Sequence, residues 1–513
     1  MTENTNQALD IHGKPYSRVT LIVIILFATF AGMLNQTSLG TALPTLMKDF
    51  DITMATAQQA TTWFLLVNGI MVPVSAFLMT KFPTKWLYQS AYALLFAGML
   101  LSALTPADKD YWMMFIAGRA LQAMAVGITM PLMQLVMVNV FPPEKRGAVM
   151  GLGGLVIGMA PAIGPTLSGW ILEKDHTILG LTLSNSWRSI FVFPLIVLGL
   201  ALVLGFFFLK DVIPNRNSKL DWLSLALSTL GFGSFLWGFT NVASDGWGAG
   251  QTVILPILFG IGIIGLFIWR QLVMPVPFLN VRVFMNKQFT LTTLSVSLAM
   301  MAMMGVEMML PLYMQNVHGL TPLESGIALL PGALMMGIIS PIAGIAYDKV
   351  GAKRLARVGF LILAIGTLPF LFLGIDTPVH FITLLYALRM FGIAMVMMPL
   401  TASAMSALPI EQSANGTASN NTARQIASAV VVALLTSVTQ NIISHQTPVH
   451  SLQVENPIKY AAKMAQASLD GFHVSFAIGL GFALLGFLVA NFLAGMHKSQ
   501  VVDLQTTEEG ESL

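Results

Sequence analysis

The stretch from Gly151 to Gly169, GLGGLVIGMAPAIGPTLSG, decides the fold because it combines a long apolar run with many helix-breaking residues. A membrane-spanning helix tolerates such residues, since neighbouring helices satisfy the backbone groups that they leave free. Gly154 and Gly158 lie four residues apart on one helix face, where a second helix backbone can approach closely. Positions that permit a bend or further close packing follow at Pro161, Gly164, Pro165 and Gly169. We predict a membrane helix that packs tightly and bends, and helix packing alone is the simpler alternative.

The composition is that of an all-α integral membrane protein. The 513 residues are 55% hydrophobic and only 10% charged, and the mean hydropathy is +0.76. Cysteine is absent, so disulfides and cysteine metal sites are excluded. A spanning helix needs roughly 20 apolar residues. Fourteen segments qualify: 19–41, 57–80, 86–105, 112–138, 147–172, 189–209, 221–241, 252–272, 289–314, 325–347, 356–374, 380–405, 423–443 and 473–496.

Basic residues are distributed unevenly between the two sets of loops. Cytoplasmic loops carry an excess of Lys and Arg, and a cytoplasmic N-terminus puts most of the basic residues inside. Only a few then fall outside: Lys48, Lys109, Lys174, Arg188, Lys459 and Lys463. Residues 1–18 also lack the apolar core of a cleaved signal peptide. We therefore expect a multi-pass protein of the cell (inner or plasma) membrane with both termini in the cytoplasm, as tails at 1–18 and 498–513.

A faint internal repeat groups the helices. Residues 73–87, PVSAFLMTKFPTKWL, align with residues 341–355, PIAGIAYDKVGAKRL, and about the same displacement of 268 residues relates several other landmarks. These are Pro44 and Pro311, Arg119 and Arg389, Pro131 and Pro399, and Glu144 and Glu411. The repeat predicts two six-helix bundles, at 19–210 and 286–497, with a two-helix insert at 211–285. Parallel repeats with a site between them are a transporter architecture.

These motifs resemble the major facilitator superfamily, and within it the fourteen-helix drug:proton antiporters of the EmrB/QacA type. The sequence from Gly344 to Arg354, GIAYDKVGAKR, matches the signature loop of that superfamily. Arg119 and Gln122 resemble its R-x-x-Q-G motif, with Ala123 in place of the glycine. The opening stretch resembles the antiporter motif through Ala160, Pro161, Gly164, Pro165 and Gly169, and the resemblance implies export rather than import.

The resemblance assigns a gating role to the signature loop, and two departures qualify the match. The loop residues expected to form a conformational latch are Asp348, Lys349, Lys353 and Arg354, although charges that only set the topology would look the same. The corresponding first-half loop has Ala76, Thr80 and Pro83 where the signature prefers Gly, Asp and Gly. Asn35 stands where many relatives carry an acid, and an amide cannot exchange a proton at physiological pH.

Glu307 is the one carboxylate expected at the centre of a membrane segment. Ionisable residues inside a membrane are expensive and usually mark a pathway, a relay or a paired contact. Burial disfavours the charged form of a carboxyl group, which would let Glu307 exchange a proton near neutral pH, although a purely structural role is the alternative. By resemblance, Arg119 is the favoured partner in coupling. Arg389 and Arg424 are expected to anchor helices near their cytoplasmic ends.

Residues around Glu307 and on the first helices indicate an adaptable pathway for apolar ligands. Methionine fills irregular space and suits promiscuous surfaces, and six methionines surround Glu307, among them Met304 and Met308. Scattered polar and aromatic contacts would come from Asn35, Gln36, Trp63 and Gln122, each of which could equally be core packing.

We therefore predict a proton-coupled multidrug efflux transporter that exports hydrophobic, often cationic compounds. A more specific exporter or permease for a lipid, peptide or metabolite is the main alternative. A membrane enzyme would need clustered acid, base or metal-binding side chains, which the short loops lack. The chain also has no phosphate-binding GxxxxGK[ST] loop, so we expect the proton gradient and no cofactor to drive transport. The expected partners are small hydrophobic or cationic drugs, protons and the bilayer, without nucleic acid or a metal.

Overall fold

A computed structural model describes residues 7–52, 54–142, 145–178, 181–215, 221–275, 277–446 and 456–494. Fourteen helices in this part are long and apolar enough to cross a membrane, as the sequence predicts. They are α1 (Arg18–Phe50), α2 (Met54–Lys81), α3 (Thr84–Leu104), α4 (Trp112–Val140), α5 (Arg146–Glu173), α6 (Val192–Phe208), α7 (Trp222–Asp245), α8 (Leu255–Val273), α9 (Lys287–Asn316), α10 (Pro322–Val350), α11 (Ala352–Thr367), α12 (Val379–Ser406), α13 (Ser413–Gln446) and α15 (Pro457–Ala490).

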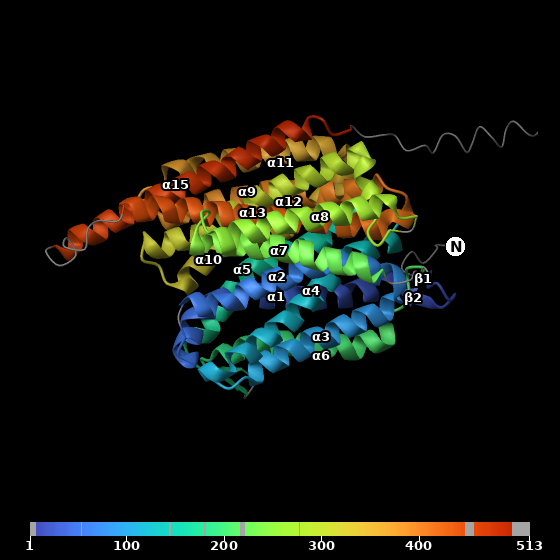
Figure 1. Ribbon diagram of the computed structural model, residues 1–513, viewed down its shortest axis with the longest axis horizontal. Coiled ribbons are helices and arrows are strands. Elements are labelled where there is room, and N and C mark those ends of the chain that lie inside the picture. The colour runs from blue at the N-terminus through green and yellow to red at the C-terminus, as the bar shows by residue number, and fades with distance from the viewer. Residues whose placement is uncertain are drawn as a thin grey trace, which may run out of the picture.

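The helices lie roughly parallel and antiparallel in one elongated bundle (Figure 1). We call the end of the bundle where α1 begins and α15 ends the terminal end, and the opposite end the far end. Two short hairpins flank the helices, one formed by β1 (Gln7–Leu9) and β2 (Pro15–Ser17) and one by β3 (His176–Ile178) and β4 (Leu181–Leu183). The beginning of α1 and the end of α15 lie at the same end of the bundle (Figure 1).

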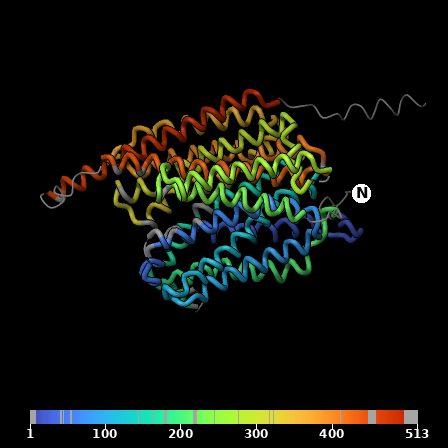
Figure 2. The backbone as a smooth tube through the Cα atoms, viewed as in Figure 1, coloured from blue at the N-terminus to red at the C-terminus, as the bar shows by residue number. Residues whose placement is uncertain are grey.

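The helices form two groups that follow the order of the chain. Helices α1 to α6 pack on one another, and helices α9 to α15 do the same. In Figure 2 the first group is blue to green and the second yellow to red, and they lie on opposite sides of the molecule. The prolines that define the sequence repeat lie inside equivalent helices of the two groups, with Pro73 in α2 and Pro341 in α10, and Pro131 in α4 and Pro399 in α12.

Helices α7 and α8 form a hairpin on one side of the bundle. Helix α7 packs on α2 of the first group and on α13 of the second, whereas α8 packs mainly on α7. Few residues of α8 are buried inside the protein, namely Gly260, Phe267 and Gln271, so most of its surface is free to face lipid. The insert therefore covers the junction between α2 and α13 (Figure 1).

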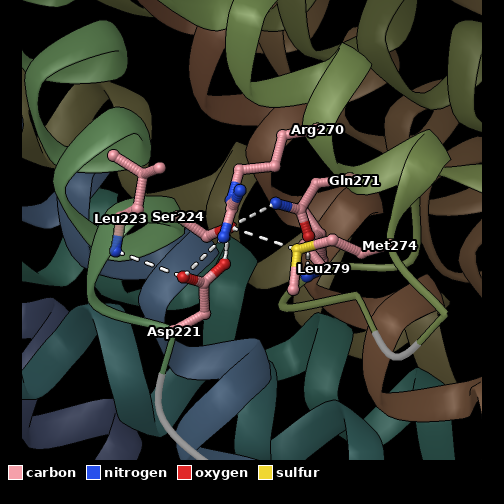
Figure 3. A network of polar contacts seen from close by, with 7 residues as sticks. All are labelled: Asp221, Leu223, Ser224, Arg270, Gln271, Met274 and Leu279. Carbon is pink, nitrogen blue, oxygen red and sulfur yellow. Dashed lines mark hydrogen bonds and ion pairs between the residues drawn. The ribbon is translucent and has the colours of Figure 1, made fainter.

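A polar network fastens this hairpin at the terminal end (Figure 3). Asp221 caps α7 by accepting from the Leu223 N–H, and Arg270 of α8 donates to both carboxylate oxygens of Asp221 at 3.0 Å. Gln271 donates to Ser224 at 2.7 Å and accepts from the Leu279 N–H. The network thus joins α7, α8 and the segment that leads into α9.

Candidate functional site

Glu307 lies in α9, about 9 residues or roughly 14 Å along the helix from its far end. The side chain is half-buried, and its Oε2 atom is buried without a hydrogen-bond partner among the described residues. Its charge interacts with Arg389 and Tyr386, both on the neighbouring α12. The ion pairs found in the described part of the chain, within 4.0 Å, do not include Glu307. One oxygen of this carboxyl group is thus left without a described partner, and its exchange of a proton stays a prediction.

Arg389 is held beside Glu307 by hydrogen bonds to two other helices. Its Nε donates to Thr367 Oγ1 of α11 at 2.8 Å, and its NH2 donates to the Ala302 carbonyl of α9 at 2.9 Å. The guanidinium also lies over the Phe370 ring at 5.7 Å. Arg389 is 1% exposed and lies about 17 residues from the terminal end of α12, so the expectation that it anchors that end of the helix is wrong. The place beside Glu307 belongs to Arg389 rather than to the expected Arg119.

Arg119 instead belongs to a compact polar network in the first group. Its NH1 donates to Gln122 Oε1 at 2.8 Å, and Asn35 Nδ2 donates to the same oxygen at 2.7 Å. Gln122 Nε2 donates in turn to the Gly98 carbonyl and to Ser102 Oγ. All the hydrogen-bonding capacity of the Gln122 amide is used, which fixes α1, α3 and α4 together.

The predicted pathway residues fall in different surroundings. Asn35 and Gln122 are 1% and 0% exposed within the first group, which differs from the expected position on a cavity wall. Trp63 packs against Trp237 of the insert at a ring-centroid distance of 5.5 Å. Gln36 and Met304 are half-buried, and the side chain of Met308 lies outside the described part. These roles stay predictions.

Helix α5 packs against α10 through its glycines, as the small-residue pattern predicts. A methyl group on Gly151 would lie 2.5 Å from the Ser340 carbonyl oxygen and 2.6 Å from Pro341 Cα. A methyl group on Gly154 or Gly158 would be as close to side chains of α10 and α12. At the far end, a methyl group on Gly169 would lie 3.4 Å from Leu323 Cα, which is ordinary contact. The two groups therefore touch along most of α5.

The rest of the antiporter-like stretch faces α1. Thr37 Oγ1 donates to the Ala160 carbonyl at 3.0 Å, and Gly164 lies so close to α1 that a methyl group would be 3.1 Å from the Leu34 carbonyl oxygen. Pro165 is half-buried, and the side chain of Pro161 lies outside the described part. The helix is continuous from Arg146 to Glu173, so its bending in transport stays a prediction.

The signature loop lies at the terminal end, between α10 and α11. Gly351 makes the turn with a φ of +79°, a conformation that favours glycine. Asp348 lies against the first turn of α5, since a methyl group on Gly147 would be 2.6 Å from its Oδ1 atom. A helix N-terminus carries partial positive charge and favours a carboxylate. Lys349 and Arg354 are exposed and Lys353 is half-buried. Asp348 thus contacts the opposite group where a latch is expected.

A cavity of about 400 Å³ opens between the two groups near the terminal end. Its walls come from α2, α4, the segment after α6, and the start of α13. The lining residues are Met79, Thr80, Leu135, Asn139, Val212, Ile213, Pro214, Asn215, Glu411 and Ala414. No group of three His, Asp or Glu side chains in the described chain could hold a metal ion.

The sequence pattern of the Major Facilitator Superfamily matches residues 25–432. The chain belongs to this superfamily. The uncharacterised transporter YcnB of Bacillus subtilis, described as of the same type, is 41% identical over 481 residues, covering 94% of this chain and 96% of YcnB. The lincomycin resistance protein LmrB of the same organism is 37% identical over 482 residues, covering 94% and 96%.

A solved structure shows the same fold at much lower identity. The human organic anion transporter MFSD10 superposes with a TM-score of 0.62 at 15% identity, covering 92% of this chain and 99% of that one. The expected major facilitator fold and superfamily are therefore confirmed, and the chain is a multi-pass membrane protein.

Arg389 is the main site residue that the sequence interpretation undervalued. The signal was present, because the repeat aligns Arg389 with Arg119. Equivalent positions in two bundles that share one fold should both be buried, and both are.

Proposed function

We propose that this chain is a proton-coupled exporter of hydrophobic, often cationic compounds, working by alternating access. Membership of the superfamily supports transport, and the similarity to LmrB, a lincomycin resistance protein, supports drug export. The observation that carries the proposal is the half-buried Glu307 carboxyl group, which has an unpartnered oxygen beside Arg389.

In the proposed cycle, Glu307 takes up a proton while the far end is open, and the compound leaves. The protein then closes at the far end and opens at the terminal end, where the proton is released and a new compound binds. Coupling requires only that proton and compound favour opposite states of this group or of the protein. Asp348 against the start of α5 would stabilise closure at the terminal end.

We place this transporter in the cell membrane with the terminal end in the cytoplasm. Support comes from the basic residues that cluster there, such as Lys81, Lys349 and Arg354. A more specific exporter on the same scaffold is distinguished by its substrate range.

The test is compound-driven proton movement in proteoliposomes, with lincomycin, several lipophilic cations and one neutral compound. We compare the wild type with Glu307→Gln, which keeps size and polarity but cannot ionise. Asn35→Ala serves as the control, because it changes the polar network of Arg119 and Gln122 and not Glu307. We expect Glu307→Gln to abolish coupled transport while the compound still binds. Normal uphill transport by Glu307→Gln would mean that the coupling group is elsewhere.

A further inference from the structure

Arg424, like Arg119, is a buried cation that forms no ion pair within the described part of the chain. Arg424 of α13 is 6% exposed, and its position about 11 residues into the helix puts it roughly 16 Å from the terminal end. Its Nε is buried without a hydrogen-bond partner in the described chain. Its NH1 donates only a long hydrogen bond, of 3.5 Å, to Asn421 Oδ1. The expectation that Arg424 anchors a helix end is therefore wrong.

No acidic side chain compensates this charge among the described residues. The ion pairs found there do not include Arg424. The guanidinium does not lose its proton in proteins. A buried charge without a partner is costly, and charged residues within membrane helices usually mark a pathway or a pair. The group therefore lacks a negative partner among the described residues.

Arg424 lies on a polar stripe at the junction between the two groups. Asn421, one turn earlier on α13, donates to Gln134 Oε1 of α4 at 2.7 Å, a hydrogen bond that joins the two groups directly. Ser428, one turn later, has a buried hydroxyl without a partner, and so has the Nε2 of Gln134. The unused groups are mostly hydrogen-bond donors, so this stripe suits a ligand rich in acceptor oxygens.

The stripe lies beyond the cavity at the terminal end. Ala414 and Leu135 line that cavity. Asn421 is about 7 residues, or roughly 10 Å, further along α13 from Ala414, and Gln134 adjoins Leu135. The same two helices thus lead from the cavity to the polar stripe.

We propose that Arg424, with Gln134 and Ser428, binds the anionic group, such as a carboxylate, of an amphiphilic compound carried by this transporter. The inference rests on the proposed transport function and adds a substrate class to it, acidic compounds beside the cationic ones. The ligand would replace the missing counter-ion, and release would follow when movement of the two groups separates α4 from α13.

The test measures binding to the purified full-length protein in detergent by fluorescence anisotropy. Three probes share one hydrophobic body and differ in charge: 1-pyrenebutanoate, 1-pyrenebutanol and 4-(1-pyrenyl)butyltrimethylammonium. We compare the wild type with Arg424→Gln and Arg424→Lys. The control is Lys463→Gln, which removes one positive charge from an exposed position on α15.

We expect Arg424→Gln to weaken binding of the carboxylate probe by about tenfold or more, as for loss of a charge-assisted hydrogen bond. The alcohol and ammonium probes should change by less than about twofold, and Arg424→Lys should retain part of the preference. Equal loss for all three probes, or no loss for the carboxylate, would overturn the proposal. If Arg424→Gln does not fold, the Gln134→Leu variant tests the proposal instead. It also removes a hydrogen-bond donor from the site, so it should weaken binding of the carboxylate probe and leave binding of the other two probes unchanged. Binding needs no proton gradient, so failure of coupled transport would leave this result interpretable.

Discussion

Replacing Gly151 with alanine should force α5 away from α10. The new methyl group would meet backbone atoms, the Ser340 carbonyl oxygen at 2.5 Å and Pro341 Cα at 2.6 Å. Backbone cannot rotate aside, so the helices must separate locally by about 0.9 Å to reach ordinary contact. Overpacking costs about 1–3 kcal/mol, against which alanine in a helix gains up to about 1 kcal/mol. We expect a net loss of up to about 2 kcal/mol.

The assay is the thermal unfolding midpoint of the purified protein in detergent, together with transport in proteoliposomes. Gly262→Ala is the matched control, because Gly262 lies in α8 with nothing within 4 Å of the new methyl group. Gly158→Ala is intermediate, since its methyl group would meet only the flexible side chain of Met336. We expect the lowest unfolding midpoint for Gly151→Ala and an intermediate one for Gly158→Ala. The midpoint of the Gly262→Ala control should equal or exceed that of the wild type. A Gly151→Ala variant as stable and active as the Gly262→Ala control would refute the reasoning.

Three further predictions concern the polar contacts. Asp348→Asn should reduce transport and lower, severalfold, the cross-linking of cysteines introduced at the terminal ends of α5 and α10, in a chain that has no cysteine of its own; unchanged cross-linking would contradict the latch. Burial raises the pKa of Asp221, but hydrogen bonds from Arg270 and Ser224 outweigh it and hold the pKa below its ordinary 3.8. Asp221 therefore stabilises the fold above that pH, and the stability difference between wild type and Asp221→Asn should shrink as the pH falls through the lowered pKa; a difference that grows in acid would exclude this pairing. Gln122→Leu leaves several buried groups unpaired and should cost about 2 kcal/mol or more in thermal unfolding, whereas an unchanged midpoint would show that the network does not stabilise the fold.

The membrane fold was predictable from the sequence because its signals are local. Each spanning helix needs its own apolar run, and close helix packing needs small residues at a fixed spacing. The contacts of Gly151, Gly154 and Gly158 with the second group follow from that spacing. The glycine spacing does not predict that the partner is α10, because it describes the surface of α5 alone.

The site was predictable only in part. The apolar surroundings of Glu307 identify it from the sequence, but its neighbour depends on which helices pack together. Arg119 and Arg389 occupy equivalent repeat positions, and only the packing of α12 on α9 puts Arg389 beside Glu307. Similarly, the polarity of Asn35 and Gln122 is visible in the sequence, whereas their mutual hydrogen bond is a tertiary contact.

The packing of α7 over α2 and α13 has a consequence for the route that a compound takes. A molecule dissolved in the lipid tails would have two sideways routes between the groups, one at α2 and α13 and one at α5 and α10. Helix α7 covers the first, and the glycine contacts of α5 close the second. We therefore expect a compound to enter this conformation along the axis of the bundle and not sideways from the lipid tails. Such a route would pass the headgroup layer, so it would favour amphiphilic compounds over purely hydrophobic ones.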